Sequence, residues 1–569
     1  MLDTYHQRAA RFQSEIEVAE ARSLQASNRR TGVFLAAIAC VIIARYAPIP
    51  PAASTILYAL GPILLIVFIG LIFGHRRISD ALDRAKHLKQ LNLDAAARLG
   101  RDWEHFPTPP TPVEFRDHST AKDLDLFGPA SLFQLVNTAI TPGGRERLAD
   151  WLSNPTDPET AAARQPAVHE LAPMLDWRQE LHLAGHALQD RDESKNAMPV
   201  RDDSATWISG SPLLLAAARL LPAAFTLLAL GQLGGVVAKP WWIFPLILMF
   251  GLNKIFGKRI EHTLGDIRRE ESALQAYTAV FAKLEELTPQ SEWLKHRHDQ
   301  IEGAHEAVEQ LCNYATSNAA RGSIVYPLLK YGLMWDFHVA RGVEQWHQRH
   351  AANVEGWFDA LAQIEAAASL ANLHHDEPSW VFPDFSPDKT VIGKQLGHPL
   401  INATSRVAND LTVDPPGQFL LVTGSNMSGK STLLRSLGLN LTLAQAGAPC
   451  CASSLQLPPL SIVTSLRVED SLTEGVSFFM AELKRIKAAV QLADDPPAGR
   501  TILYLFDEIL RGTNSVERQA IVQQLLGHLL QRDAIGAITT HDLALAEIES
   551  LKSAAKAVHF RESFKDTPD

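Results

Sequence analysis

Residues 423–432 read TGSNMSGKST, and this stretch decides how the C-terminal part of the chain folds. It contains the pattern G-x-x-x-x-G-K-[ST], directly after the apolar run QFLLV and directly before the helical run TLLRSLGLNLTLAQAG. A strand, a glycine-rich turn and a helix in this order are typical of a loop whose main-chain N–H groups cradle phosphates at the start of a helix. We expect Lys430 to reach the β- and γ-phosphate oxygens and Ser431 to ligate Mg²⁺. The expected nucleotide-binding residues are Gly424, Ser425, Asn426, Met427, Ser428, Gly429, Lys430, Ser431 and Thr432.

Two more apolar runs end in polar residues that suit the same chemistry. TILYLFDE ends in Asp507, which we expect to hold Mg²⁺ through water, and Glu508, which would orient or deprotonate an attacking water. AIGAITTH ends in His541, which can sense a γ-phosphate. Taken singly, an apolar run ending in DE and a lone histidine are also common in purely structural roles. Together with the phosphate loop they indicate nucleotide hydrolysis, without saying what the hydrolysis drives.

These apolar runs alternate with helical segments from about residue 377 onward, which predicts a largely parallel sheet covered by helices, the α/β class. The long segment before it, 258–376, carries apolar residues at helical spacing between charged ones. We expect six segments along the chain. They are a charged helix at 1–30, a hydrophobic hairpin at 31–77, a helical core-like region at 78–210, a second hairpin at 211–257, a helical lever-like region at 258–376 and the ATPase domain at 377–569.

The first hairpin has the composition of a membrane anchor. Its second limb, TILYALGPILLIVFIGLIFG, has about twenty uncharged residues, enough to cross a hydrocarbon layer of about 30 Å. Arginines at 29 and 30 and at 76 and 77 flank the hairpin, which predicts that both ends lie in the cytoplasm. The second hairpin is interrupted by Arg219. The sequence therefore predicts a multi-pass protein of the inner (cytoplasmic) membrane with its ATPase domain in the cytoplasm; buried hydrophobic helices in a soluble domain are the alternative.

The order of the C-terminal motifs and the residues in them resemble those of the ATPase domain of the MutS family, the DNA mismatch-repair ATPases. The family pattern TGPNMGGKST appears here as TGSNMSGKST, its DEIGRGTS-type segment as DEILRGTNS, and its THY- or THF-type histidine as His541 in TTHD. EDSLTEGVSFFMAEL resembles the family's signature segment and implies that Ser477 reaches the γ-phosphate bound by the other subunit. Upstream, GHPLI and VANDLTV resemble the entry into this domain, and SLFQLVNTAITPGGRERLADWLSNP resembles the start of the family's helical core.

The resemblance implies ATP and Mg²⁺ as ligands, a homodimer formed through the ATPase domains, and DNA as the ligand of an ATP-driven switch. Some positions differ from the family pattern: Leu510 replaces a glycine, and Arg406 stands where an aromatic residue often stacks on adenine. Val476 and Phe478 flank Ser477 where Arg and Thr are usual. No mismatch-reading domain with a Phe-x-Glu wedge is recognisable, and the net charge of -10 gives no global attraction to nucleic acid, so the resemblance does not extend to mismatch recognition. A transporter-like ATPase and a nucleotide-dependent membrane scaffold stay open as alternatives.

Overall fold

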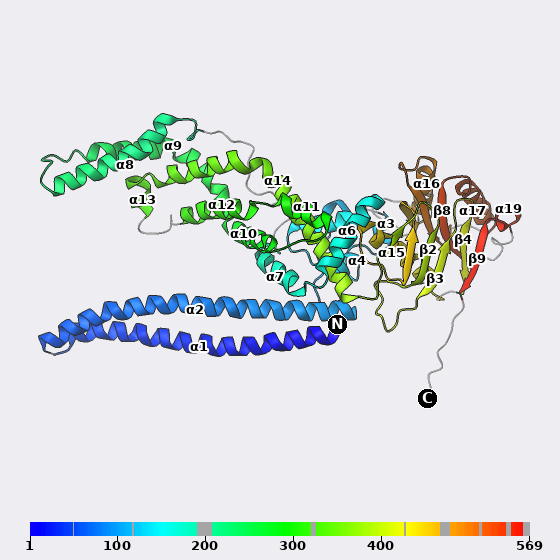
Figure 1. Cartoon of the computed structure of the whole chain (residues 1–569), viewed down its shortest axis with the longest axis horizontal. Coiled ribbons are helices and arrows are strands. Elements are labelled where there is room, and N and C mark those ends of the chain that lie inside the picture. The colour runs from blue at the N-terminus through cyan, green and yellow to red at the C-terminus, as the bar shows by residue number, and fades with distance from the viewer. Residues whose placement is uncertain are drawn as a thin grey trace. The chain divides into compact units, whose positions relative to one another are not determined.

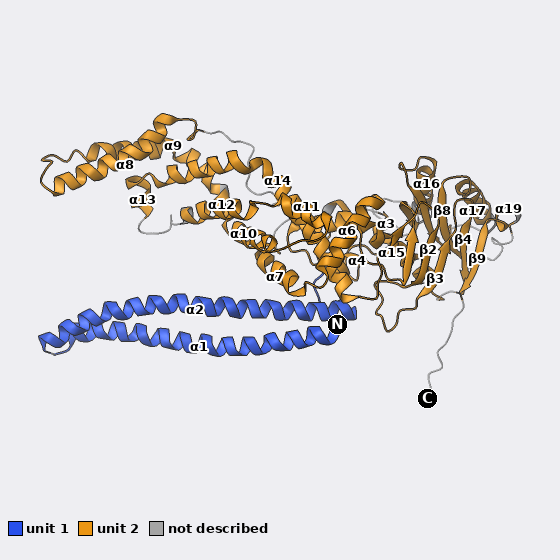
Figure 2. Ribbon diagram, viewed as in Figure 1, with its two compact units in different colours: residues 1–108 blue, residues 109–569 orange. Residues whose placement is uncertain are grey.

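The computed structural model describes residues 1–48, 50–115, 119–189, 207–319, 326–425, 428–466, 478–510, 515–541 and 548–560. The chain forms two compact units, residues 1–108 and residues 109–569 (Figure 2). The boundary between the units lies within the Pro-rich stretch FPTPPTPVEF. Its prolines favour an extended backbone, which is typical of a connection between units.

The first unit is a hairpin of two long helices, α1 (Leu2–Tyr46) and α2 (Pro51–Gly100), which pack side by side (Figure 1). Near the start of α1 and the end of α2 the hairpin has a buried apolar seam that includes Tyr5, Phe12 and Leu88. Polar contacts border this seam: Lys89 Nζ donates to Gln13 Oε1 at 2.8 Å. α1 runs through residue 30 and α2 through residue 77, so the charged and the apolar parts of each limb form one continuous helix.

The middle of the chain is helical, as predicted, and belongs to the second unit. Its longest element is α14 (Trp335–Asp376), whose last four turns are buried almost all round because alanine and leucine dominate them. The other helices are α3 (Ser119–Asp123), α4 (Leu132–Val136), α5 (Pro142–Ser153), α6 (Pro158–Leu171), α7 (Leu175–Gly185), α8 (Pro212–Leu233), α9 (Ile243–Arg269), α10 (Glu271–Glu285), α11 (Glu292–Gln300), α12 (Ala304–Ala319) and α13 (Tyr326–Gly332), with short 3-10 turns at Val113–Phe115 and His186–Leu188.

The C-terminal part is built on a parallel sheet of five strands in the order β6-β7-β8-β4-β9. The strands are β4 (Phe419–Gly424), β6 (Leu460–Ser465), β7 (Thr501–Asp507), β8 (Ala534–Thr540) and β9 (Ala555–Phe560). The predicted strands QFLLVTG, TILYLFDE and AIGAITTH are thus confirmed as β4, β7 and β8, and so is the α/β class of this region. Because all five strands are parallel, the polar residues that end β4, β7 and β8 lie at the same edge of the sheet.

Helices cover both faces of this sheet. Alternate strand residues such as Leu421, Tyr504 and Phe506 share an apolar core with α16 (Phe478–Asp494) and α17 (Ser515–Leu529). The opposite face carries α15 (Lys430–Ala446), where Gly438 lets Leu505 of β7 approach. The short helix α19 (Glu549–Lys552) precedes β9.

A second, four-stranded sheet was not predicted. Its strands are β1 (Asp384–Phe385), β2 (Val391–Leu396), β3 (Asn409–Val413) and β5 (Ser454–Leu457), in the order β1-β5-β2-β3. β2 pairs antiparallel with both β3 and β5. This sheet includes residues 409–413 of VANDLTV as β3.

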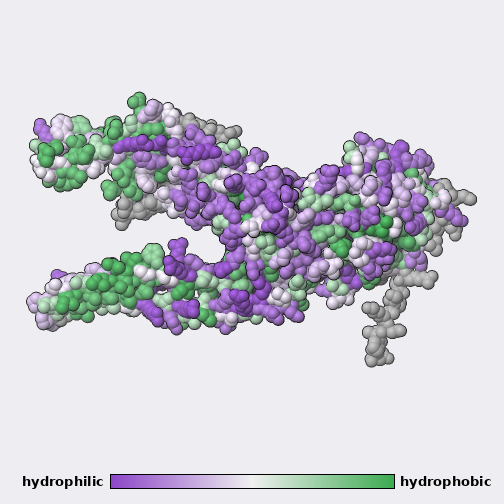
Figure 3. Space-filling view, viewed as in Figure 1, coloured by the Kyte–Doolittle hydropathy of each residue, from purple (hydrophilic) through white to green (hydrophobic). Residues whose placement is uncertain are grey.

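Three of the described helices are long and apolar enough to cross a membrane: α1, α2 and α8. Only 6% of the most apolar window of α1 or α2 is buried, against 17% for α8. Figure 3 shows hydrophobic side chains gathered on the part of the α1–α2 hairpin toward its turn. Ile38, Ile66 and Phe73 are among the exposed large hydrophobic residues of these two helices. The fourth expected limb, α9, is not among the three, since lysines at 254 and 258 and an arginine at 259 interrupt it.

Candidate nucleotide-binding site

The glycine-rich turn joins β4 to α15 at the carboxyl edge of the parallel sheet. β4 is buried up to its last residue, Gly424, whose φ is +153°, and α15 begins directly after Gly429, whose φ is +96°. A Cβ at position 424 would lie 2.7 Å from the Phe560 carbonyl oxygen and 2.9 Å from Ser428 Oγ, so only glycine fits there. The backbone thus bends tightly round a cradle with the first N–H groups of α15 at its edge.

Lys430 is the first residue of α15, and its ammonium group is folded under the turn. Lys430 Nζ donates to the carbonyl oxygens of Gly424 at 2.9 Å and Ser425 at 2.7 Å, and it lies 3.8 Å from Glu508 Oε1. The lysine side chain is only 4% exposed. Ser431 and Thr432 follow in the first turn of α15, whereas Asn426 and Met427 lie outside the described residues.

Thr539 on β8 positions both predicted carboxylates. Asp507, the last residue of β7, pairs with Thr539 across the sheet, and the Thr539 hydroxyl hydrogen-bonds Asp507 Oδ1. The Glu508 N–H approaches the same hydroxyl at 3.1 Å and the Thr539 carbonyl oxygen at 3.2 Å. Glu508 has a φ of +46°, a left-handed conformation that is unusual for this residue type. Thr539 was not predicted as a site residue; its place two residues before His541 in TTH was the available signal.

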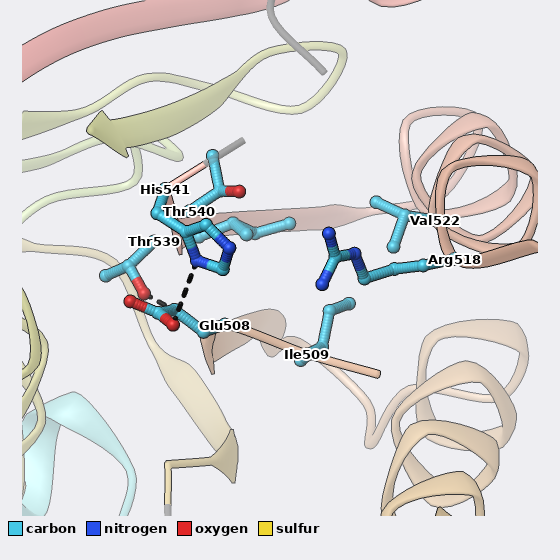
Figure 4. Close-up of a pocket in the computed structure, with 8 residues that line it drawn as sticks. Glu508, Ile509, Arg518, Val522, Thr539, Thr540 and His541 are labelled. Carbon is cyan, nitrogen blue, oxygen red and sulfur yellow. Dashed lines mark hydrogen bonds and ion pairs between the residues drawn. The ribbon is translucent and has the colours of Figure 1, made fainter. Parts of the chain in front are cut away.

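His541 completes a chain of contacts through Glu508. His541 Nδ1 lies 3.1 Å from Glu508 Oε2, while the other carboxylate oxygen faces Lys430. Figure 4 shows the imidazole and carboxylate turned toward each other, with Arg518 of α17 across a small pocket that both line. The structure therefore brings together Lys430, Glu508 and His541, which are more than a hundred residues apart at the extremes.

The residues at this edge fit a triphosphate and Mg²⁺. Ser428 Oγ is buried and has no hydrogen-bond partner among the described residues, although it borders the cradle at Gly424. Ser431 and Asp507 offer hydroxyl and carboxylate oxygens, the hard ligands that Mg²⁺ prefers. Within the described residues no hydrogen bond or ion pair joins these two side chains; the strand order places them at one edge. Ser477 lies outside the described residues.

Arg406 is held at the entry to this domain. Its guanidinium lies 5.3 Å from the ring centroid of Trp380, donates to the Ile401 carbonyl oxygen at 2.8 Å and lies 3.6 Å from Glu377. The arginine is thus engaged with its own chain by stacking, hydrogen bonding and charge.

The C-terminal part of the chain is similar to known proteins. Residues 420–567 match the family model described as MutS domain V. The chain is 32% identical over 209 residues to the DNA mismatch repair protein MutS of Geobacillus sp. (strain WCH70), an alignment that covers 35% of this chain and 23% of that protein. It is 36% identical over 174 residues to the MutS protein of Leuconostoc mesenteroides, covering 30% of this chain and 20% of that protein.

A longer alignment, with the MutS protein of Halalkalibacterium halodurans, shows 29% identity over 321 residues and covers 55% of this chain and 33% of that protein. The chain therefore spans between a fifth and a third of the length of these relatives.

Proposed function

We propose that the C-terminal domain, whose residues 420–567 match the model of MutS domain V, binds ATP with Mg²⁺ and hydrolyses it. The observation that carries the proposal is the convergence of Lys430 and His541 on the two carboxylate oxygens of Glu508, beside the glycine cradle. All the proposed catalytic groups lie in motifs of the family, and Ser477 alone among them would come from a second subunit.

Each residue has a chemical task in this proposal. Lys430 exchanges its two carbonyl partners for phosphate oxygens, which stabilises negative charge on the phosphates. Ser431 and Asp507 would hold Mg²⁺, which neutralises phosphate charge when bound. Glu508 orients the attacking water and accepts its proton, and His541 fixes the Glu508 carboxylate by hydrogen bonding.

The whole protein, we further propose, is anchored in the cytoplasmic membrane and works as a dimer that switches with its nucleotide. The exposed apolar lengths of α1, α2 and α8 support the anchor. The resemblance of the signature segment supports a dimer in which Ser477 acts across the interface. DNA is the ligand that the relatives' names suggest for the switch.

Two substitutions test the ATPase. We expect Lys430→Ala to weaken MgATP binding roughly ten- to hundredfold, since a charge-assisted contact is lost. Glu508→Ala should keep binding but lower single-turnover hydrolysis by a factor of roughly 10² to 10⁴. Lys389→Ala is the matched control, because Lys389 is a half-exposed lysine of the same domain that pairs with Asp533. Wild-type hydrolysis no faster than that of Glu508→Ala would contradict the enzyme proposal and favour a nucleotide-dependent scaffold.

The ligand of the switch needs a separate measurement. ATPase rates of the detergent-solubilised protein with homoduplex, mismatched and branched DNA, at several salt concentrations, should rise with DNA and lose that rise as salt increases. Stimulation by a solute in liposomes, with none by DNA, would instead favour the transporter-like alternative.

A further inference from the structure

A buried aspartate outside the nucleotide motifs joins the helical region to the ATPase domain. Asp123, the last residue of α3, has no exposed surface. Its Oδ2 accepts hydrogen bonds from Thr464 Oγ1 at 2.8 Å and from the Leu466 N–H at 3.0 Å. Its Oδ1 accepts from Arg485 Nη1 at 2.7 Å. One carboxylate therefore holds the carboxyl end of β6 and the helix α16 at a fixed spacing.

These two elements are the described neighbours of the segment that resembles the MutS signature. Leu466 is the last described residue before that segment, and α16 is the first described element after it. A charge-assisted contact in a dry environment is both strong and geometrically strict. Any shift of α3 must therefore be passed to β6 and α16 together, or the carboxylate is left buried without its cation.

The next two residues reach the helix that begins with Lys430. Leu124 has no exposed surface, and a Cβ at Gly438 of α15 would lie 2.5 Å from Leu124 Cδ2. Asp125 Oδ2 lies 3.5 Å from Arg435 Nη1, also on α15. The tripeptide 123–125 thus contacts the phosphate-loop helix on one side and the flanks of the signature segment on the other.

Hydrogen bonds on either side of α4 connect the same tripeptide to the long helix α14. The Asp125 carbonyl oxygen accepts from the Leu132 N–H at 2.9 Å, at the start of α4. Just after α4, the Thr138 N–H donates to Ser369 Oγ of α14 at 3.1 Å. A displacement of α14 is therefore transmitted by packed, hydrogen-bonded contacts to both parts of the nucleotide site.

We propose that Asp123 is a positioning residue for ATP hydrolysis: it sets α16 and β6 against α15, and so couples the helical region to turnover. This inference rests on the proposed ATPase function and adds a residue to it that none of the nucleotide motifs contains. Asp123 acts through Arg485 and Thr464. Its loss therefore changes the rate of hydrolysis more than the affinity for the nucleotide.

The test is a double-mutant cycle with Asp123→Asn, Arg485→Met and the double variant, using steady-state ATPase kinetics of the full chain and its thermal midpoint. We expect Asp123→Asn to lower kcat roughly tenfold while KM for MgATP changes less than about twofold. The double variant should be no slower than the slower single variant, because both remove the same contact. Asp359→Asn is the matched control: it breaks the 2.5 Å pair of Asp359 with Arg147 in the helical region and should leave kcat unchanged.

Additive losses in the cycle would overturn the coupling role, and so would an equal fall of kcat in Asp123→Asn and Asp359→Asn, which would indicate general loosening. If Asp123→Asn does not fold, Thr464→Val removes one of the contacts described above with a side chain of the same size, and a wild-type kcat in that variant also contradicts the inference. The same assay also compares wild type with Lys430→Ala. If these two do not differ, the ATPase proposal itself fails, and this outcome is distinct from a failure of the inference about Asp123.

Discussion

Glu508 shows how a single residue can be held in a strained conformation where it is needed. A left-handed φ costs a residue with a Cβ roughly 1–2 kcal/mol. The contacts of the Glu508 N–H with the Thr539 hydroxyl and carbonyl offset that cost. In this conformation the carboxylate faces Lys430 through one oxygen and His541 through the other. Thr539→Val should therefore change the conformation of Glu508 as well as the packing of β8.

His398 gives the chain a stability that depends on pH. Burial, reinforced by the positive charges of Arg435 and Arg406, lowers the pKa of His398 from its ordinary 6.5 to about 4. Its Nδ1 accepts from the Leu400 N–H at 3.2 Å, which requires that nitrogen to be unprotonated. Between pH 6.5 and about 4 the unfolded chain binds the extra proton and the folded chain does not, so stability is lost as pH falls through this window.

We therefore expect the thermal midpoint of the wild-type chain to fall between pH 6.5 and 4, by the equivalent of about 3 kcal/mol from this group. His398→Gln, which cannot take up the proton, should flatten that part of the profile. His296→Gln on the exposed face of α11 is the control. The same slope in His398→Gln and wild type would show that other groups carry the pH dependence.

At the scale of elements, α14 is tied to the start of α5 by one buried carboxylate. Glu365 Oε1 accepts from the N–H groups of Ile140 at 3.1 Å and Thr141 at 3.2 Å, and its other oxygen contacts the Thr141 hydroxyl. Burial raises the pKa of Glu365. Gly144 is required beside it, because a Cβ there would lie 2.3 Å from Glu365 Oε2. The motif TPGG thus serves packing between two helices.

Two substitutions of Glu365 distinguish the contribution of its acceptor oxygens to stability from that of its charge. We expect Glu365→Ala to lower the free energy of unfolding by about 2–3 kcal/mol, since two buried N–H groups lose their acceptor. Glu365→Gln keeps an acceptor oxygen and should cost much less. Glu355→Ala, on the exposed side of the same helix, is the control, and urea titrations of the three variants measure the differences. Equal losses in the Ala and Gln variants would mean that the charge itself is needed.

Some elements were predictable from the sequence and others were not, for a physical reason. β4, β7 and β8 are buried on both faces, so each reads as a continuous apolar run followed by its polar residue. The small sheet escaped prediction because its strands are short and β1 pairs with β5, whose residues lie some seventy positions later. The contacts of Asp123 are invisible to local pattern for the same reason, since Thr464 lies 341 positions away. The segment boundaries and the role of Ser477 stay predictions.

At the scale of the whole molecule, the α1–α2 unit divides into a polar-bordered base and an apolar end. The base contains the buried seam and pairs such as Lys86 with Glu20 at 3.4 Å, while the end exposes large apolar side chains along both helices. α1 has 45 residues and would extend about 68 Å at 1.5 Å per residue, whereas a hydrocarbon layer takes up about 30 Å. The remaining turns of α1 and α2 would stand outside the bilayer as a stalk.

Deletion of the apolar segments tests the anchor. We expect the full chain to stay in the membrane pellet through washes with 1 M salt, since burial of apolar surface in lipid is insensitive to screening. Removing both 31–74 and 211–256 should release the folded remainder into the supernatant. Removing only 31–74 should release more protein than removing only 211–256, because Lys254, Lys258 and Arg259 interrupt α9, whereas α2 carries no basic residue along its apolar run. If the double deletion still pellets with membranes and resists salt, these segments are not the anchor and the proposal is wrong. If it pellets but is released by salt, charge holds it there.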